Sequence, residues 1–222
     1  VFNLLLIGPG RGGTSLLFSL LDSHSQIHLE FEKQAKAILM NTDIPAARRV
    51  TLFKNNLEKE LKNYKERWKG VKITSEHLLP LYKNTGSFTF SDILLKNTKV
   101  IFIIRDGHSC VKSKIERTGT SYEEARDKWQ FAVKLYQHFS NYSNIFFLKY
   151  EELVTHPQAQ LNFICQFLDI PFESQMLKGV SSDRLPEMYK NDTFVTSKLQ
   201  QKEYPKNWTL DMQQELEYLN YL

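Results

Sequence analysis

A glycine-rich turn between an apolar run and a helical run is the feature that most constrains the fold of this chain. Residues 8–15 read Gly-Pro-Gly-Arg-Gly-Gly-Thr-Ser and directly follow the apolar stretch 4–7. Glycines let the backbone turn tightly and aim several N–H groups at one point, and a following helix adds the positive end of its dipole. We therefore predict a strand, an anion-binding loop that uses Arg11, Thr14 and Ser15, and a helix. From this segment alone, a turn without a ligand is the alternative.

The loop differs from the phosphate loop of nucleotide triphosphatases. In that loop a lysine follows the last glycine and reaches the β/γ-phosphates, and the next hydroxyl residue binds magnesium. Here Thr14 occupies the position of the lysine, and the cation has moved forward to Arg11. No apolar strand ends in an obvious metal-binding aspartate. The sequence therefore predicts an anion ligand other than a metal-bound triphosphate.

A second constellation follows another apolar run. Residues 99–104 are rich in β-branched side chains, as in a buried strand, and Arg105 comes directly after them. In open α/β sheets ligands bind at the carboxyl ends of the strands. A helix after this turn would place Ser113 and Arg117 on one face, so that these two and Arg105 could hold one phosphate. Unless Arg105 is only a surface ion-pair partner, two such strand ends predict a nucleotide with two phosphate-bearing ends.

These motifs resemble the sulfotransferases that use 3′-phosphoadenosine 5′-phosphosulfate (PAPS). The first motif of that family, a basic residue followed by Ser-Gly-Thr-Thr or Ser-Gly-Thr-Ser, is similar to residues 11–15 here, with Gly12 in place of the usual serine. The second is an arginine with a serine eight positions later, as for Arg105 and Ser113. The resemblance implies that Arg11, Gly12, Gly13, Thr14 and Ser15 hold the 5′-phosphosulfate and that the second motif binds the 3′-phosphate.

Within that family the chain looks most like the tyrosylprotein sulfotransferases. Arg105-Asp106-Gly107 followed by Ser113 and Arg117 carries this likeness, and it extends to the segments 149–153 and 167–171. The resemblance implies that Tyr150 stacks on or hydrogen-bonds to the nucleotide and that Lys198, from a late loop, reaches it. A core tyrosine with a satisfied hydroxyl is the alternative for Tyr150.

Sulfuryl transfer needs a base close to the first loop to take the proton of the acceptor hydroxyl. Glu32 is our candidate because it lies 21 residues beyond Arg11, the spacing of the catalytic glutamate in the tyrosylprotein branch. Glu30, His24 and His28 are the other candidates for the base. Glu32 could instead be a carboxylate at the N-terminus of a helix that begins at Lys33.

A cation is also expected beside the transferring group. Arg11 serves this role in our interpretation, and Lys72 is a second candidate because related enzymes carry a lysine at a similar strand end. The residues after Lys72 are Ile73 and Thr74, whereas Asp-Pro or Thr-Pro is common in the family. A lysine that snorkels from an apolar strand to the surface is the alternative.

Alternation of apolar strands with amphipathic stretches predicts an α/β sulfotransferase fold, with a parallel central sheet flanked by helices and a P-loop-like phosphate-binding loop. A chain of 222 residues with 41% hydrophobic residues suits one domain, residues 1–222. Strands are predicted at 2–7, 27–29, 71–74, 100–104 and 144–148. Helices are predicted at 14–23, 45–68, 121–142, 158–168 and 210–222, and residues 178–201 are predicted to form a loop.

Charge and composition exclude several other classes. The net charge of +4 is too modest to mark a nucleic-acid binder, and two cysteines form neither a disulfide framework nor a metal cluster. No stretch approaches the length of a membrane-spanning helix, so we expect no membrane segment. The cytoplasm is the default compartment, although an anchor or targeting signal upstream of Val1 stays open.

The function predicted from these features is transfer of the sulfuryl group of PAPS to an acceptor hydroxyl, without a metal ion. The resemblance favours a protein or peptide tyrosine, with a basic groove to which Arg48 and Arg49 contribute. A carbohydrate or small alcohol is the alternative acceptor, because variable loops form the acceptor pocket. A magnesium-dependent small-molecule kinase and a catalytically silent nucleotide-binding module are the rival classes.

Overall fold

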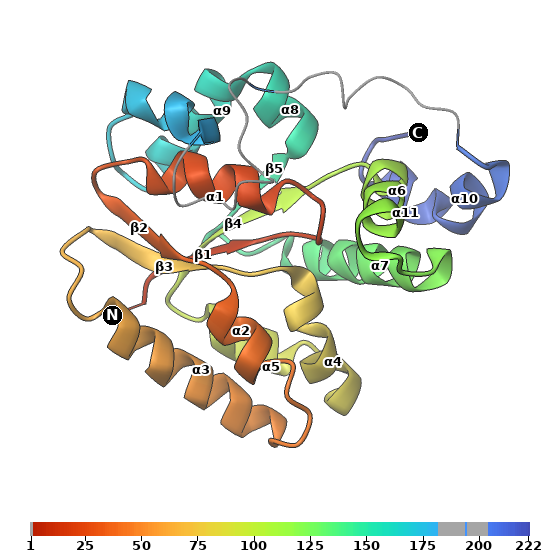
Figure 1. Ribbon diagram of the computed structural model, residues 1–222, viewed down its shortest axis with the longest axis horizontal. Coiled ribbons are helices and arrows are strands. Elements are labelled where there is room, and N and C mark those ends of the chain that lie inside the picture. The colour runs from red at the N-terminus through yellow and green to blue at the C-terminus, as the bar shows by residue number, and fades with distance from the viewer. Residues whose placement is uncertain (1, 182–193, 195–203) are drawn as a thin grey trace.

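The fold is built on a five-stranded parallel sheet with the strand order β2–β3–β1–β4–β5 (Figure 1). The computed structural model describes residues 2–181, 194 and 204–222. The strands are β1 (Leu4–Ile7), β2 (Ile27–Glu30), β3 (Trp68–Lys72), β4 (Lys99–Ile104) and β5 (Ile145–Lys149). All neighbouring strands pair in parallel. The predicted α/β class with a central parallel sheet is confirmed.

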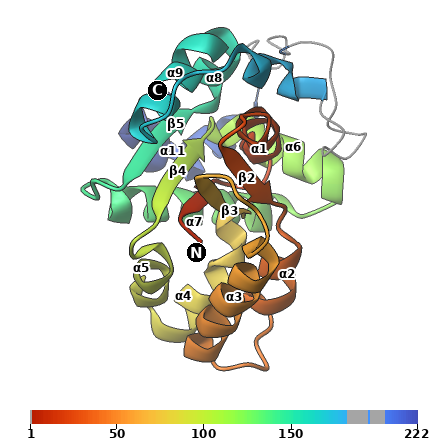
Figure 2. The same cartoon turned by 90° about the vertical axis from the view of Figure 1, so that its left-hand side faces the viewer.

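Helices cover both faces of the sheet. One face carries α1 (Thr14–Asp22), α8 (Tyr150–Thr155), α9 (Pro157–Phe167) and the 3₁₀ segment η2 (Ser174–Ser181). The other carries α2 (Lys33–Ile38), α3 (Ala46–Leu61), α4 (Leu79–Thr85), α5 (Thr89–Leu95), α7 (Tyr122–Phe139) and α11 (Gln213–Tyr218). Figures 1 and 2 show these layers, with α8 and α9 on one side of the sheet and α3, α4 and α5 on the other.

The apolar character of the strands follows from this double cover. Successive side chains of a strand point to opposite faces, and here each face is buried. Leu4 and Leu6 of β1 pack in the cluster that includes α1 and α9, whereas Leu5 and Ile7 pack in the cluster that includes α3 and α7. All four side chains are fully buried. A continuous apolar run is therefore the pattern that this position in the sheet requires.

Two predicted helices have different ends in the structure. The helix predicted over 45–68 ends at Leu61, and Trp68 begins β3. Trp68 donates its indole N–H to the carbonyl of Leu168 and its backbone N–H to Gln26, so tertiary pairing overrides the helical propensity of the Lys- and Glu-rich run. The helix predicted over 210–222 is divided into α10 (Lys206–Asp211) and α11 around Met212, whose φ of −120° is not helical.

The sequence reading missed the short helices α4, α5 and α8. It treated 178–201 as a loop, but residues 178–181 belong to η2, and most of the remainder lies outside the described residues.

The carboxyl ends of the three central strands, β3, β1 and β4, meet at one edge of the sheet. The loop 8–13 leaves β1 there, the 3₁₀ turn η1 (Ser75–His77) follows β3, and α6 (Gly107–Thr118) follows β4. Ligands of open α/β sheets bind at this edge. Within the described part of the chain, no helix has the length and apolarity needed to span a membrane.

Candidate active site

A cleft of about 970 Å³ opens at the carboxyl edge of the sheet. Its size lies within the range of small-molecule sites in proteins, roughly 300–1,000 Å³. Nine of the predicted site residues line it: Arg11, Gly13, Thr14, Ser15, Glu32, Lys72, Arg105, Ser113 and Tyr150. They come from the loop after β1, from the segment after β2, from the ends of β3 and β4, and from α6 and α8. The topology thus brings together residues that lie far apart in the sequence.

The glycine-rich loop presents the N-terminus of α1 to the cleft. Gly13 is the N-cap of α1, with a φ of 94°, and it offers no side chain to cap the helix. The first N–H groups of a helix have no intrahelical acceptor, so an uncapped N-terminus at a cleft favours an anion. Gly12 closes the turn through its N–H to the carbonyl of Pro9 (2.9 Å) and is not part of the cleft wall.

Arg105 lies at the end of β4, with 8% of its surface exposed. One terminal nitrogen donates to the carbonyl of Arg11 (3.2 Å), and the guanidinium carbon lies 4.4 Å from the ring centroid of Tyr150. Trp129 of α7 fixes the turn by donating its indole N–H to the carbonyl of Arg105 (3.0 Å). The alternative of a surface ion-pair partner is wrong, because Arg105 is buried, and its guanidinium contacts the Arg11 carbonyl and the ring of Tyr150.

The hydrogen-bonding state of Arg105 Nε indicates whether an anionic ligand fits here. This atom is buried and has no hydrogen-bond partner within the described part of the chain. A buried donor left without an acceptor costs about 1–3 kcal/mol. A phosphate that accepts from Arg105 would remove that cost, so the donor set fits a phosphate-bearing ligand.

Helix α6 brings one of its two predicted residues into the cleft. The carboxylate of Asp106 caps α6 by accepting from the backbone N–H of Ser109 (2.8 Å). The hydroxyl of Ser113 accepts from Nε of Arg11 (3.1 Å), which joins the two predicted phosphate motifs. Arg117 lies one turn further along α6, is exposed and is not part of the cleft wall. Of the three residues expected to hold one phosphate, the fold thus brings Arg105 and Ser113 to the cleft wall.

Glu32 and Lys72 form an ion pair in the cleft wall. The Lys72 Nζ lies 2.5 Å from Oε2 of Glu32. Lys72 ends β3 and is 2% exposed, so the snorkelling alternative is wrong. Burial lowers the pKa of Lys72, and the charge of Arg11 adds to this effect, whereas the carboxylates of Glu32 and Glu76 oppose it. Glu32 is the N-cap residue of α2, but its side chain makes no capping hydrogen bond.

The other candidates for the base lie elsewhere. Oε1 of Glu30 lies 2.9 Å from Nε2 of His28, within hydrogen-bond distance. Nε2 of His24 is hydrogen-bonded to the carbonyl of Pro171 at 2.7 Å. None of these three side chains lines the cleft. Among the four candidates, Glu32 is the one that the fold presents to the cleft.

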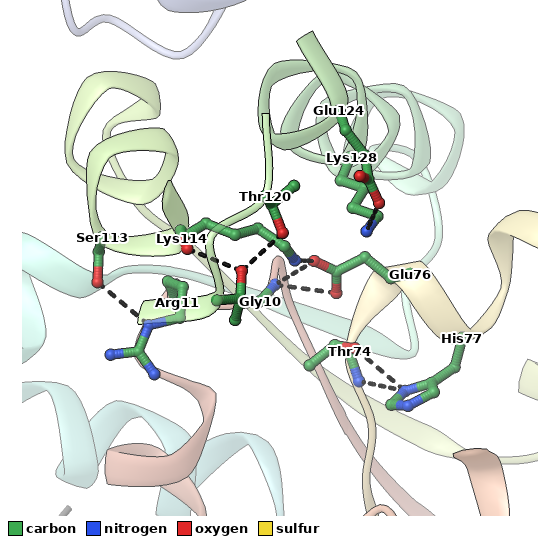
Figure 3. A network of polar contacts seen from close by, with 11 residues as sticks. Gly10, Arg11, Thr74, Glu76, His77, Ser113, Lys114, Thr120, Glu124 and Lys128 are labelled. Carbon is green, nitrogen blue, oxygen red and sulfur yellow. Dashed lines mark hydrogen bonds and ion pairs between the residues drawn. The ribbon is translucent and has the colours of Figure 1, made fainter. Parts of the chain in front are cut away.

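The sequence reading missed several charged or titratable residues of the cleft wall, among them Glu76, His77 and Lys114 (Figure 3). Glu76 accepts from the backbone N–H of Gly10 and pairs with the Lys114 ammonium. His77 Nδ1 accepts from the backbone N–H of Thr74 (3.0 Å), which assigns the ring proton to Nε2. Burial lowers the pKa of His77. Glu76 and His77 follow β3 by only a few residues, so the rule that ligands bind at strand ends could have found them.

Further parts of the cleft wall come from α2 and the residues after it, from α4 and from residues nearer the C-terminus. They include Lys36, Met40, Thr42, Leu79, Pro80, Lys83, Phe194 and Tyr204. Arg49 does not belong to a basic groove there, because it is fully buried and donates to the carbonyl of Leu39 (2.7 Å). Lys198 lies outside the described residues.

A model of the sulfotransferase family matches residues 83–174, which include Arg105 and Ser113. The resemblance to the sulfotransferase family is confirmed. The protein-tyrosine sulfotransferase of Drosophila melanogaster is 26% identical over 196 residues, and protein-tyrosine sulfotransferase A of Caenorhabditis elegans is 25% identical over 206 residues. Each alignment covers 77% of this chain, but only 38% and 50% of the respective relatives. The chain thus spans half or less of the length of these relatives.

Solved sulfotransferase structures share the fold. The sulfotransferase domain of the Synechococcus olefin synthase superposes with a TM-score of 0.72 at 18% identity, and covers 100% of this chain and 95% of that one. The sulfotransferase domain of the curacin biosynthetic pathway gives a TM-score of 0.68 at 19% identity, with coverage of 100% and 98%. The chain has the sulfotransferase fold.

Proposed function

We propose that this protein transfers the sulfuryl group of PAPS to a hydroxyl group of an acceptor. The observation that carries the proposal is the cleft itself, whose wall combines an uncapped glycine-rich loop, a buried Arg105 with an unsatisfied Nε and an ion pair of Glu32 and Lys72. Phosphate groups suit the first two features, and the third supplies a base and a cation. The named relatives, which are protein-tyrosine sulfotransferases, support the same reading.

Three cleft residues take part in the chemical step of this proposal. Glu32 takes the proton of the acceptor hydroxyl while the acceptor oxygen forms its bond to sulfur. The bond from sulfur to the bridging phosphate oxygen breaks, and 3′-phosphoadenosine 5′-phosphate leaves with that oxygen. Arg11 and Lys72 stabilise the negative charge that develops during transfer. This chemistry needs no metal ion, so we expect turnover in the presence of EDTA.

The nucleotide is proposed to lie across both strand-end motifs. The loop residues Gly12, Gly13, Thr14 and Ser15 would surround the 5′-phosphosulfate, with Gly12 acting through the turn that it closes. Arg105 and Ser113 would bind the 3′-phosphate, and Tyr150 would contact the nucleotide beside Arg105. Arg117 and Lys198 remain predictions drawn from the resemblance.

The acceptor is proposed to be tyrosine in a protein or peptide, and residues 1–222 are proposed to act as one sulfotransferase unit. The support is that the relatives are named protein-tyrosine sulfotransferases and that lysines of the cleft wall suit an acidic acceptor, namely Lys36, Lys83, Lys112 and Lys128. A panel of a tyrosine peptide, an oligosaccharide and a small alcohol discriminates between the acceptor classes.

The test is sulfuryl transfer from labelled PAPS to each acceptor, with the Glu32→Gln variant beside the unchanged protein. Loss of a general base lowers the rate about 10²–10⁴-fold, whereas binding of 3′-phosphoadenosine 5′-phosphate should be retained. Glu30→Gln is the matched control, because Glu30 lies on the same segment but outside the cleft. Equal turnover by the Glu32→Gln variant, or transfer of phosphate from magnesium-ATP in place of sulfuryl transfer, would refute the proposal.

A further inference from the structure

The cleft contains a second lysine–glutamate pair, which the proposed reaction does not use. Glu76 on η1 and Lys114 on α6 form an ion pair whose side chains are only 10% and 14% exposed (Figure 3). Both residues line the cleft. The pair lies between the end of β3 and the helix that carries Ser113.

Glu76 contacts the phosphate-binding loop directly. The backbone N–H of Gly10 lies 3.2 Å from Oε1 and 3.1 Å from Oε2 of Glu76. A Cβ atom at Gly10 would lie 2.5 Å from Oε1 of Glu76 and 2.9 Å from Nζ of Lys114, so a larger residue here would displace the ends of both side chains. Gly10 immediately precedes Arg11. A carboxylate thus occupies an N–H group at the start of a loop that otherwise suits phosphate.

The carboxylate is charged at neutral pH. Burial alone would raise the pKa of Glu76, but the Lys114 ammonium and the hydrogen bonds from Lys114 and Thr74 outweigh burial and hold this pKa below its usual value. The pair therefore adds one negative and one positive charge beside the loop, with a net charge of zero. Without Glu76, the ammonium of Lys114 would face the bound nucleotide uncompensated.

We infer that Glu76 is an internal counter-anion of the phosphate-binding loop, which weakens the binding of the bisphosphate nucleotide and thereby speeds its release. This inference rests on the proposed function. In this role Glu76 is a positioning residue, because it acts through the Gly10 N–H and Lys114 and takes no part in bond making. The direction of the change in affinity distinguishes this role from a purely structural one. Removal of the Glu76 charge should strengthen nucleotide binding, whereas loss of a structural contact should weaken it.

Glu76→Gln tests the inference, because glutamine keeps the size of the side chain and an oxygen that can accept from Gly10, while the charge is lost. The Kd for 3′-phosphoadenosine 5′-phosphate, measured by calorimetry, is expected to fall about tenfold, and the dissociation rate to slow in proportion. Lys114→Met should raise the Kd by a similar factor. The double variant, in which the net charge is again zero, should bind the nucleotide with nearly the affinity of the unchanged protein.

Asp169→Asn is the control. It also converts the carboxylate of an ion pair into an amide, but the exposed pair of Asp169 with Arg67 is not part of the cleft wall, so the Kd should change less than about twofold. If the unchanged protein binds the nucleotide and Glu76→Gln binds it with an equal or higher Kd, the inference is overturned but the proposed function is not. Absence of binding by the unchanged protein would overturn the proposed function and the inference together. If Glu76→Gln does not fold, unchanged binding by Lys114→Met overturns the inference.

Discussion

Substitution of Gly13 by alanine should destabilise the protein through two effects that the structure separates. Gly13 has a φ of 94°, a conformation that costs an alanine about 1–2 kcal/mol. The added Cβ would also lie 2.3 Å from Cδ2 of Tyr150 and 3.3 Å from Cδ1 of Ile103. Neither neighbour has room to move, because Tyr150 is 6% exposed beneath the guanidinium of Arg105 and Ile103 is fully buried. Overpacking of this kind adds about 1–3 kcal/mol.

The expected loss in the free energy of unfolding is therefore about 2–5 kcal/mol, the sum of the two contributions. Urea unfolding followed by circular dichroism measures it. Gly119→Ala is the matched control, because Gly119 has a φ of 64° and its Cβ would meet nothing within 4 Å. That variant should lose only the conformational part, about 1–2 kcal/mol. Equal losses for the two variants would refute the argument that Tyr150 packs against the phosphate-binding loop.

Three further predictions concern the cleft. Lys72→Met should lower kcat by about 10²–10³-fold in a sulfuryl-transfer assay, because one charge-stabilising group is lost; a kcat within twofold of the unchanged protein would contradict its role. Arg105→Gln should weaken binding of 3′-phosphoadenosine 5′-phosphate by at least about tenfold, but leave the weaker binding of AMP unchanged, since AMP lacks the 3′-phosphate; an equal effect on both ligands, measured by calorimetry, would contradict the assignment. Burial lowers the pKa of His77 below the 6.5 of a free imidazole, so its neutral ring contributes stability above about pH 6.5 that is lost as the pH falls towards the folded-state pKa. As the pH falls from 7.5 to 5.5, the free energy of unfolding measured with urea should therefore decrease less for His77→Gln than for the unchanged protein. Equal decreases in the two proteins would show that His77 does not cause the loss.

The central strands β1 and β4 were predictable because each is an apolar run that the fold buries on both faces. The run 100–104 and the run before the glycine-rich loop carry this signal in only a few residues each, and both proved to be central strands. The loop was predictable for a related reason. Glycine suits the positive φ at Gly13, and at Gly10 it lets the Glu76 carboxylate approach the backbone N–H.

The ends of elements and the cross-chain partners were less accessible from the sequence. Trp68 lies in a run of helix-forming residues, and only pairing with β2 and Leu168 makes it a strand residue. Arg117 has the right helical spacing from Ser113, but spacing does not reveal how far α6 extends from the sheet edge. The contact between Glu76 and Lys114 joins segments 38 residues apart, which no local pattern encodes.

Thermal stabilisation by 3′-phosphoadenosine 5′-phosphate tests the central claim most directly, with AMP and magnesium-ATP as controls. A ligand that binds the folded protein alone raises its apparent stability, by about 2.7 kcal/mol at a concentration 100 times the Kd. We expect a clear rise in Tm with the bisphosphate, a smaller one with AMP, and none specific to magnesium-ATP. No shift with the bisphosphate, or a larger one with magnesium-ATP, would contradict a PAPS-dependent sulfotransferase and favour a kinase.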